Sequence, residues 1–321
     1  MTIIRLGYVA MSVNLQNASP SRTMTFTQFK KIKDREAAIA KLERISRANI
    51  ENSLRLLKHN AAHDISFFRF SSRLVPLANH PEVEDWDYLK AIQGSLAEIK
   101  NWLAEHPARV DFHPDHFVLL TSRKVDVLNN TIKTLNMHHG LLKGMGVPAR
   151  HRCVLHVGGT YKDKEKALEV FVNNWGYVPH HIQEMIMLEN DDTTFHTADT
   201  LYLCEKLGIP LVFDYHHHLA HYDEEDFIVY WERILQTWEQ SDLPVKMHIS
   251  SPRNEKDYRA HADFIDPDMF FDFLNKVKGS VKQIDCMIEA KQKDDALFRL
   301  MEDVKKHPDA EVIDGASFKI T

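Results

Sequence analysis

Six short apolar segments of this chain each end on a side chain that can bind a metal ion. The segments lie between residues 109 and 289, and their last residues are His113, His156, Glu189, Asp214, His248 and Glu289. Each segment has the length and apolar content of a buried β-strand. If such strands pair in parallel around a barrel, their carboxyl ends surround one mouth. The pattern therefore predicts that residues far apart in the sequence form one polar cluster.

The whole chain alternates between strand and helix patterns. Apolar runs predict eight strands, at residues 3–9, 65–70, 109–113, 152–157, 183–189, 210–215, 245–249 and 283–289. Amphipathic helices are predicted between and after them, at residues 35–59, 87–104, 122–143, 163–174, 195–207, 223–239, 267–277 and 293–306. Strict alternation favours parallel pairing, so the expected fold class is α/β, with a single (β/α)8 TIM barrel. An open doubly wound sheet is the alternative, although no glycine-rich phosphate-binding fingerprint accompanies it.

Length and composition favour one large domain. A chain of 321 residues could hold two average domains, but one α/β barrel commonly fills this length. We expect a single barrel domain over residues 1–306 and a loose C-terminal tail over residues 307–321. No apolar run is long enough to span a bilayer, and the amino terminus lacks the pattern of a secretion signal. A cytoplasmic protein without a membrane partner is expected.

The chemistry of the strand-end residues favours divalent metal ions. Imidazole and carboxylate together suit Zn, Mn or Fe, and His217 and His261 extend the set of candidate ligands to eight. A single such residue is more often a helix cap or a satisfied polar group, but a series of them favours ligands. Because one catalytic zinc takes about three protein ligands, eight candidates predict two or three ions. Glu189, in the middle of the series, is the expected bridge. Such clusters suit in-line displacement at phosphorus.

Nine sequence motifs, spread in order over nearly the whole chain, resemble those of one enzyme family. The motifs are Leu6-Gly-Tyr8, Phe68-Arg-Phe-Ser-Ser72, Phe112-His-Pro-Asp-His-Phe117, Leu155-His-Val-Gly-Gly159, Leu188-Glu-Asn-Asp191, Phe213-Asp-Tyr-His-His217, Lys246-Met-His-Ile-Ser250, His261-Ala-Asp263 and Met287-Ile-Glu-Ala-Lys-Gln-Lys-Asp294. The chain resembles the ultraviolet damage endonucleases, a branch of the barrel-shaped DNA repair nucleases that also includes endonuclease IV.

The resemblance implies a metal-dependent DNA endonuclease without a nucleotide cofactor. It would incise damaged double-stranded DNA immediately 5′ of cyclobutane pyrimidine dimers and (6-4) photoproducts, and of other distortions such as abasic sites, by metal-activated hydroxide attack on phosphorus. Manganese is the usual metal, with Zn, Mg or Co as others, and we expect a monomer.

The resemblance also assigns the ligands. One ion would bind His113, His156 and Glu189, a second Glu189, Asp214, His248 and Glu289, and a third His217 and His261. Glu189, Lys246 and His248 would be catalytic. Lys246 matches a lysine that is carboxylated in the family, and an ammonium group beside divalent cations would be forced neutral and could react with CO2. An ion pair with a nearby carboxylate or a substrate phosphate is the alternative for Lys246.

Four further residues match positions that the family uses to contact the lesion. His116 and Phe117 would probe the DNA, with Phe117 inserted between weakened base steps. A glutamine is common at the first of these two positions, so His116 is a departure. Tyr8 and Asn14 would contact the lesion from the segment around the end of the first strand. The alternative for Phe117 is a loop aromatic buried against the following helix.

The net charge of −6 is unusual for a DNA-binding protein, but affinity for phosphate depends on where the cations lie. A basic rim is predicted around the mouth, formed by Arg22, Lys30, Lys31, Lys33, Arg35, Arg73, Arg253, Lys256, Arg259, Lys291 and Lys293. Two other classes of function remain open. A metal-dependent sugar isomerase on the same barrel would share the polar mouth but not the basic rim or the exposed aromatic residue. A non-catalytic DNA-binding or metal-binding module would bind without cutting.

Overall fold

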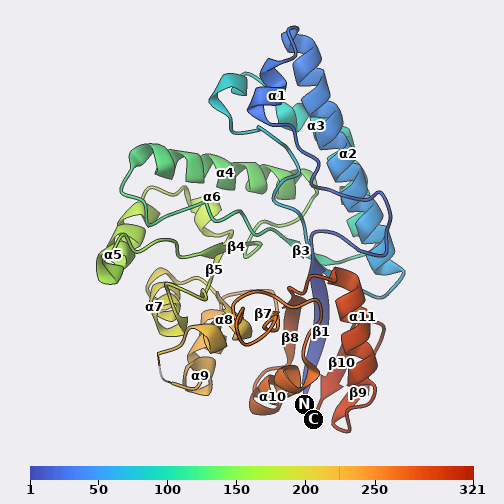
Figure 1. The fold of residues 1–321 in the computed structure, drawn as a ribbon, viewed down its shortest axis with the longest axis vertical. Helices are drawn as coiled ribbons and strands as arrows, with labels where there is room; N and C mark the ends of the chain where they lie inside the picture. The colour runs from blue at the N-terminus through green and yellow to red at the C-terminus, as the bar shows by residue number, and fades with distance from the viewer. Residues whose placement is uncertain (224) are drawn as a thin grey trace.

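A parallel barrel forms the centre of the computed structural model, which describes residues 1–223 and 225–321 (Figure 1). Within these residues, eight parallel strands follow the spatial order β3-β2-β1-β8-β7-β6-β5-β4. Their bounds are β1 (Thr2–Val9), β2 (Phe67–Arg69), β3 (Arg109–Asp111), β4 (Cys153–His156), β5 (Ile186–Glu189), β6 (Leu211–Asp214), β7 (Val245–Ile249) and β8 (Gln283–Ile288). Each of the eight predicted strands is present at its expected place in the chain.

The barrel closes between β3 and β4. A parallel bridge joins Phe112, just after β3, to Cys153 in β4. The Phe112 amide donates to the carbonyl of Arg152 over 2.9 Å, and the Val154 amide donates to the carbonyl of Phe112 over 3.0 Å. These bonds connect the two ends of the strand order, so the prediction of a (β/α)8 barrel is confirmed and the open sheet was wrong.

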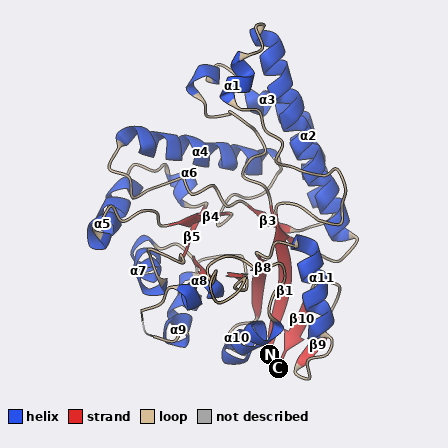
Figure 2. Ribbon diagram, in the orientation of Figure 1, coloured by secondary structure: helices blue, strands red, loops and turns tan. Residues whose placement is uncertain are grey.

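Helices surround the strands (Figure 2). The long helices are α2 (Arg35–Ala61), α3 (Tyr88–Glu105), α4 (Val125–Gly144), α5 (Lys164–Trp175), α7 (Thr197–Leu207), α9 (Ile228–Thr237), α10 (Pro267–Val277) and α11 (Lys293–Val304). The short ones are α1 (Phe26–Lys30), η1 (Pro81–Val83), α6 (His180–Gln183) and α8 (Tyr215–Ala220). The predicted helix over residues 223–239 begins five residues later, at Ile228, and Glu224 lies outside the described residues. Among the described helices, none combines the length and the apolar character needed to cross a membrane.

Local sequence signals explain where several helices begin and end. The side chains of Asp34, Asp87 and Asp163 accept hydrogen bonds from backbone amides in the first turns of α2, α3 and α5. Gly208 ends α7 with a left-handed φ of 67°, a conformation that glycine adopts without steric cost. Between strands and helices lies a core of fully buried apolar side chains, and the free thiols of the three cysteines are buried as well.

The C-terminal segment is ordered, so the expectation of a loose tail over residues 307–321 was wrong. Residues Ala310–Val312 form β9 and Ser317–Ile320 form β10, which pairs antiparallel with the first half of β1. The short strand β2 pairs with β1 only at Tyr8 and Val9, and β10 pairs with the remaining part of the same edge, from Thr2 to Arg5. Phe318 and Ile320 are fully buried, so this strand is part of the core.

Phe318→Ala is expected to lower the free energy of unfolding by about 3–5 kcal/mol, because it leaves a cavity under β1. Urea unfolding followed by circular dichroism measures the change. Val312→Ala in β9 is the matched control, since Val312 is 38% exposed and its truncation should cost roughly 0.5 kcal/mol or less. A loss below about 1 kcal/mol for Phe318→Ala, which is typical of a surface substitution, would contradict a structural role for the segment.

Candidate metal centre

The carboxylate of Glu189 lies at the centre of four imidazoles. Glu189 is the last residue of β5 and is 1% exposed. Its Oε2 atom is 2.8 Å from Nε2 of His113 and 3.8 Å from Nε2 of His156. Its Oε1 atom is 2.8 Å from Nδ1 of His248 and 3.5 Å from Nδ1 of His217. The two oxygens therefore face different pairs of histidines, which is the arrangement of a bridging carboxylate.

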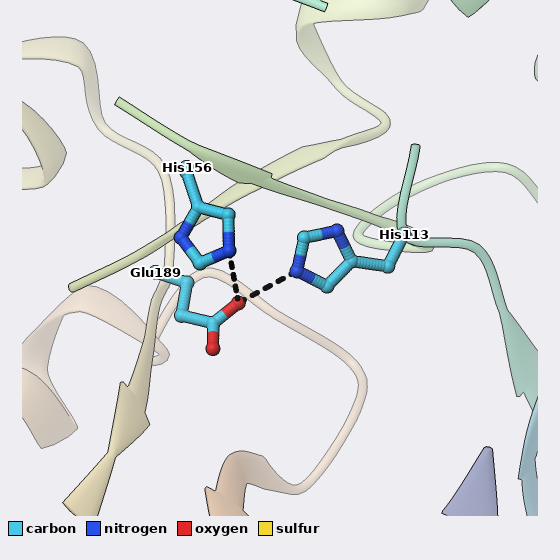
Figure 3. Close-up of side chains that lie close together, drawn as sticks. All are labelled: His113, His156 and Glu189. Atoms are coloured by element: carbon cyan, nitrogen blue, oxygen red, sulfur yellow. Dashed lines mark hydrogen bonds and ion pairs between the residues drawn. The ribbon is translucent and has the colours of Figure 1, made fainter. Parts of the chain in front are cut away.

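Three groups of side chains bring their ligand atoms close enough to share an ion. Within each group the atoms lie within 4.8 Å of one another, and the groups are His113, His156 and Glu189; Glu189, Asp214 and His217; and Glu189, His248 and Glu289. Figure 3 shows the first group, with both imidazoles directed at the same oxygen of Glu189. Glu189 belongs to all three groups, as the sequence predicted for the bridging residue.

The composition of the groups differs in part from the expected one. Asp214 was expected beside His248 and Glu289, but its ligand atoms group with Glu189 and His217. His261 belongs to none of the three groups of described residues, and its Nδ1 atom is 2.8 Å from the backbone carbonyl of Glu289. Its ring centre is 6.2 Å from that of His217, so both imidazoles border the same mouth.

Asn190 fixes the position of Asp214. The Asn190 side chain donates to the Asp214 carbonyl and accepts from the Asp214 amide, each over 2.9 Å. Asp214 also caps α8, because its Oδ1 atom accepts from the His217 amide over 2.7 Å. The cap explains how a carboxylate and an imidazole three residues apart come together. Sequence reasoning overlooked Asn190, although it directly follows the predicted bridging residue.

Several buried polar atoms of the site have no hydrogen-bond partner within the described part of the chain. They are Oδ2 of Asp214, Nε2 of His248 and Nδ1 of His156. Buried polar atoms are rarely left without a hydrogen-bond partner. These three atoms belong to residues of the candidate ligand groups, so they fit a centre that binds cations. The mixed nitrogen and oxygen donors fit divalent ions of the Mn, Fe and Zn class.

The charges of the site shift the pKa values of its groups. Burial alone would raise the pKa of Glu189, but His248, His156 and a hydrogen bond from His113 hold it well below its usual range. Burial lowers the pKa of His217, but Asp214, Glu189 and Glu289 outweigh burial and raise that pKa to about 9. Without an ion, His217 is therefore protonated at neutral pH and balances part of the negative charge.

Lys246 lies in the barrel interior. It is fully buried on β7, and its Nζ atom donates to Oδ2 of Asp111 over 2.7 Å. Residues two apart on a strand face the same side, so Lys246 and His248 both point inward. Burial lowers the pKa of Lys246, while the Asp111 carboxylate acts in the opposite direction. The ion pair with a carboxylate, the alternative considered for Lys246, is present, and carboxylation stays a prediction.

Glu289 has a cationic partner that sequence reasoning overlooked. Nη1 of Arg69, at the end of β2, is 2.5 Å from Oε1 of Glu289, and the same oxygen is 3.2 Å from Nδ1 of His248. Burial acts to raise the pKa of Glu289, but Arg69 and His248 bring it below its ordinary range. The position of Arg69 at a strand end, inside the motif Phe68-Arg-Phe70, was a signal for its place at the mouth.

The predicted lesion-binding residues have different surroundings. Phe117 is 73% exposed and its ring centre is 4.1 Å from that of His116, so burial of Phe117 against the following helix was wrong. Asn14 is exposed. Tyr8 is fully buried and its hydroxyl donates to Oδ1 of Asn60 on α2 over 2.6 Å, and the lesion contact of Tyr8 stays a prediction. Tyr8 faces outward from the barrel, whereas its neighbour Val9 packs inside it.

A cavity of about 600 Å³ connects the loop that carries His116 to the candidate metal ligands. It is lined by residues of both regions, including His116, Asp191, His156, His217, His261 and Glu289. Asp191 shapes its wall, because the carboxylate accepts hydrogen bonds from the amides of Thr193, Thr194 and Phe195. The cavity places a group bound beside His116 in reach of the candidate ligands.

The cations of the predicted basic rim are in part distant from the barrel strands and in part neutralised. Arg22, Lys30, Lys31 and Lys33 are exposed, and α1 and the first turns of α2 lie away from the barrel strands (Figure 1). Three other rim residues form surface ion pairs, namely Arg35 with Asp85, Arg73 with Asp115 and Arg253 with Asp257. The net positive charge at the mouth is therefore smaller than the sequence indicated.

Metal affinity is expected to rise with pH. The raised pKa of His217, about 9, means that its proton must be displaced below pH 9 before the ring can bind an ion. The apparent dissociation constant for Mn²⁺ should therefore fall by up to about tenfold per pH unit between pH 7 and 9. Calorimetry in two buffers of different ionisation enthalpy measures the released proton. His180→Gln, at a site 81% exposed, should leave this dependence intact. An affinity independent of pH would contradict the assignment.

Comparison with known proteins identifies the family. The family model described as UV-endonuclease UvdE matches residues 4–319. A UV DNA damage endonuclease of Halalkalibacterium halodurans is 50% identical over 97% of each chain, and one of Bacillus cereus (strain B4264) is 43% identical over 98% of each. The crystal structure of SacUVDE superposes with a TM-score of 0.82 at 28% identity, covering 94% of this chain and 98% of that chain. The chain thus belongs to the UV-endonuclease UvdE family.

Proposed function

We propose that this protein is a DNA repair endonuclease that incises the phosphodiester backbone immediately 5′ of UV photoproducts. The observation that carries the proposal is the buried Glu189 carboxylate, whose two oxygens face separate pairs of imidazoles within one mouth. Relatives that match nearly the whole chain are UV DNA damage endonucleases. A sugar isomerase and a non-catalytic module are less consistent with this family and this site.

The residues of the site divide into holding and positioning roles. His113, His156, Glu189, Asp214, His217, His248 and Glu289 would hold two or three divalent ions, with manganese as the proposed metal and His261 completing the set at the rim. When bound, such ions supply an activated water and stabilise the charge that develops at phosphorus and on the leaving oxygen. Asn190 keeps Asp214 in place, and the pair of Lys246 with Asp111 supports the inner end of the site.

Damaged double-stranded DNA is the proposed partner. Phe117 is a large apolar side chain exposed beside the cavity, and such residues can insert between base steps. Insertion is least costly where a lesion has already weakened stacking, which provides selectivity without reading the sequence. His116 would contact the opened base pair from the same loop. Exposed cations such as Lys30 and Lys33 would attract the phosphate backbone.

Incubation with Mn²⁺ and UV-irradiated duplex should give a cut 5′ of the photoproduct, while intact duplex stays uncut. Glu189→Gln should reduce cutting by about a thousandfold or more, because the bridging charge is lost. Glu184→Gln, at an exposed position near β5, is the matched control and should cut normally. Denaturing gels of end-labelled duplexes with photoproducts or abasic sites identify the substrate. Equal cutting by Glu189→Gln and the wild type would contradict the proposal.

Phe117→Ala is expected to lower the affinity for damaged duplex without removing metal from the protein. The loss of one stacking side chain is worth about 1–3 kcal/mol, or roughly five- to hundredfold in affinity. Fluorescence anisotropy with irradiated and intact duplexes measures the effect, which should be larger for the irradiated one. Tyr177→Ala removes an aromatic that is 74% exposed outside the mouth and serves as the control. Equal losses for both duplexes would exclude a lesion probe.

A further inference from the structure

Two cationic side chains, Arg69 and Lys293, lie beside Glu289. Arg69 contacts the Glu289 carboxylate directly, with 2.5 Å between Nη1 and Oε1. Lys293 follows Glu289 by four residues, and its amide donates to the carbonyl of Ala290 over 3.3 Å, so a tight turn keeps Lys293 next to the end of β8 that carries Glu289. Arg69 and Lys293 are thus two cations near the single carboxylate of Glu289. Glu289 also belongs to a group of candidate metal ligands, so it cannot balance both of them.

The ammonium group of Lys293 lacks a partner within residues 1–223 and 225–321. The side chain is half-buried, yet no hydrogen bond or ion pair of its Nζ atom occurs among the described residues. Other lysines of the chain in similar or greater burial are paired, as Lys246 is with Asp111 and Lys164 with Asp199. The Nζ atom of Lys293 is not among the buried polar atoms of the described residues that lack a partner, so this cation is half-covered by protein but open to an anionic ligand from solution.

The backbone holds Lys293 in an uncommon conformation. Its φ is 51°, in the left-handed region that residues other than glycine rarely adopt. The preceding amides are bound to the segment after β7, since Lys291 donates to the carbonyl of Ala262 over 3.0 Å and Gln292 to that of Asp263 over 3.1 Å. Local strain of this kind persists where the surroundings fix it, often at binding sites.

The following residue, Asp294, anchors the other side of Lys293. Asp294 is fully buried, and its Oδ1 atom accepts from the Val13 amide over 2.9 Å. Its Oδ2 atom lies 2.5 Å from Oγ of Ser12, 3.0 Å from Nε2 of His59 and 3.2 Å from Nδ2 of Asn14. One carboxylate thereby joins the loop after β1, the end of α2 and the start of α11. The hydrogen bonds of Asp294 thus fix the backbone next to Lys293 and hold it beside the loop that carries Asn14.

We propose that Lys293 and Arg69 form a binding site for a phosphodiester of the incised strand next to the metal centre. The proposal rests on the function proposed above and adds the residues that seat the DNA backbone there. A phosphate supplies the negative charge that Lys293 lacks, and an ion that engages Glu289 leaves Arg69 available to the same phosphate. Guanidinium and ammonium groups are the usual partners of phosphate oxygens in DNA complexes.

Binding of irradiated duplex to the full-length protein in EDTA tests the site without any cutting. Lys293→Met should weaken binding by about tenfold, which is the order expected for one charge-assisted hydrogen bond. It should also reduce the slope of log affinity against log salt by about one. Lys293→Arg should keep most of the affinity and the salt slope. Lys305→Met, at a lysine 52% exposed near the end of α11, is the matched control and should behave as the wild type.

Lys293→Gly separates binding from folding. Glycine adopts a left-handed φ readily, so this variant should unfold at the same temperature as the wild type or higher, yet bind DNA as weakly as Lys293→Met. A parallel loss of thermal stability and affinity in both variants would indicate a structural role and overturn the proposal. The same holds for an unchanged salt slope in Lys293→Met.

Duplexes with single methylphosphonate linkages around the photoproduct locate the phosphate. At one linkage near the incision, neutralisation should weaken binding to the wild type but have little further effect on Lys293→Met. Equal effects on both proteins at every linkage would overturn the proposal. Cutting by the wild type with Mn²⁺ is measured separately. If neutralisation of one linkage weakens binding to the wild type but not to Lys293→Met, and the wild type does not cut, only the proposed function is contradicted. A wild type that binds no duplex contradicts both.

Discussion

The structure depends on one buried carboxylate that is surrounded by imidazoles. Glu189 is 1% exposed, and a charge so deeply buried is costly unless other charges compensate it. His113 contacts Oε2 of Glu189 and His248 contacts Oε1, and the two histidines belong to different candidate ligand groups. His113 lies just after β3 and His248 near the end of β7. The carboxyl-terminal ends of these two strands therefore supply the imidazoles that balance the charge of Glu189. Barrel closure brings β3 next to β4, which pairs with β5, so the same strand pairing that closes the barrel also places His113 at Glu189.

Below the mouth, buried carboxylates of the barrel interior are also balanced by cationic side chains. Lys246 pairs with Asp111 over 2.7 Å, and one layer further down the fully buried Asp285 accepts from Arg109 over 2.8 Å. Arg5 donates to the other oxygen of Asp285 over 2.9 Å. Replacement of one partner of a buried pair leaves an uncompensated charge and typically costs about 3–5 kcal/mol. The polar interior fixes the orientation of the strands that carry the ligands, rather than contributing apolar burial.

The order of strands and the place of the candidate ligands could be predicted because both follow from periodicity. Apolar runs that end on His, Asp or Glu placed Glu189 and His156 at strand ends, and parallel pairing brought them to one mouth. The C-terminal strand was missed because β10 has four residues and gains its stability from pairing with β1. The partner of Lys246 was missed for a similar reason, because Asp111 lies on a different strand, 135 residues away.

The sequence by itself determined the barrel, the end at which the candidate ligands gather and their residue types, because alternation and strand length are local properties of the chain. Tertiary structure alone decided which candidate ligands share a group, since Glu189 joins Asp214 and His217 only because β5 lies beside β6. It also decided that Tyr8 faces α2 and that Arg69 contacts Glu289. These relations depend on strand register and on contacts between distant segments, and no local pattern encodes them.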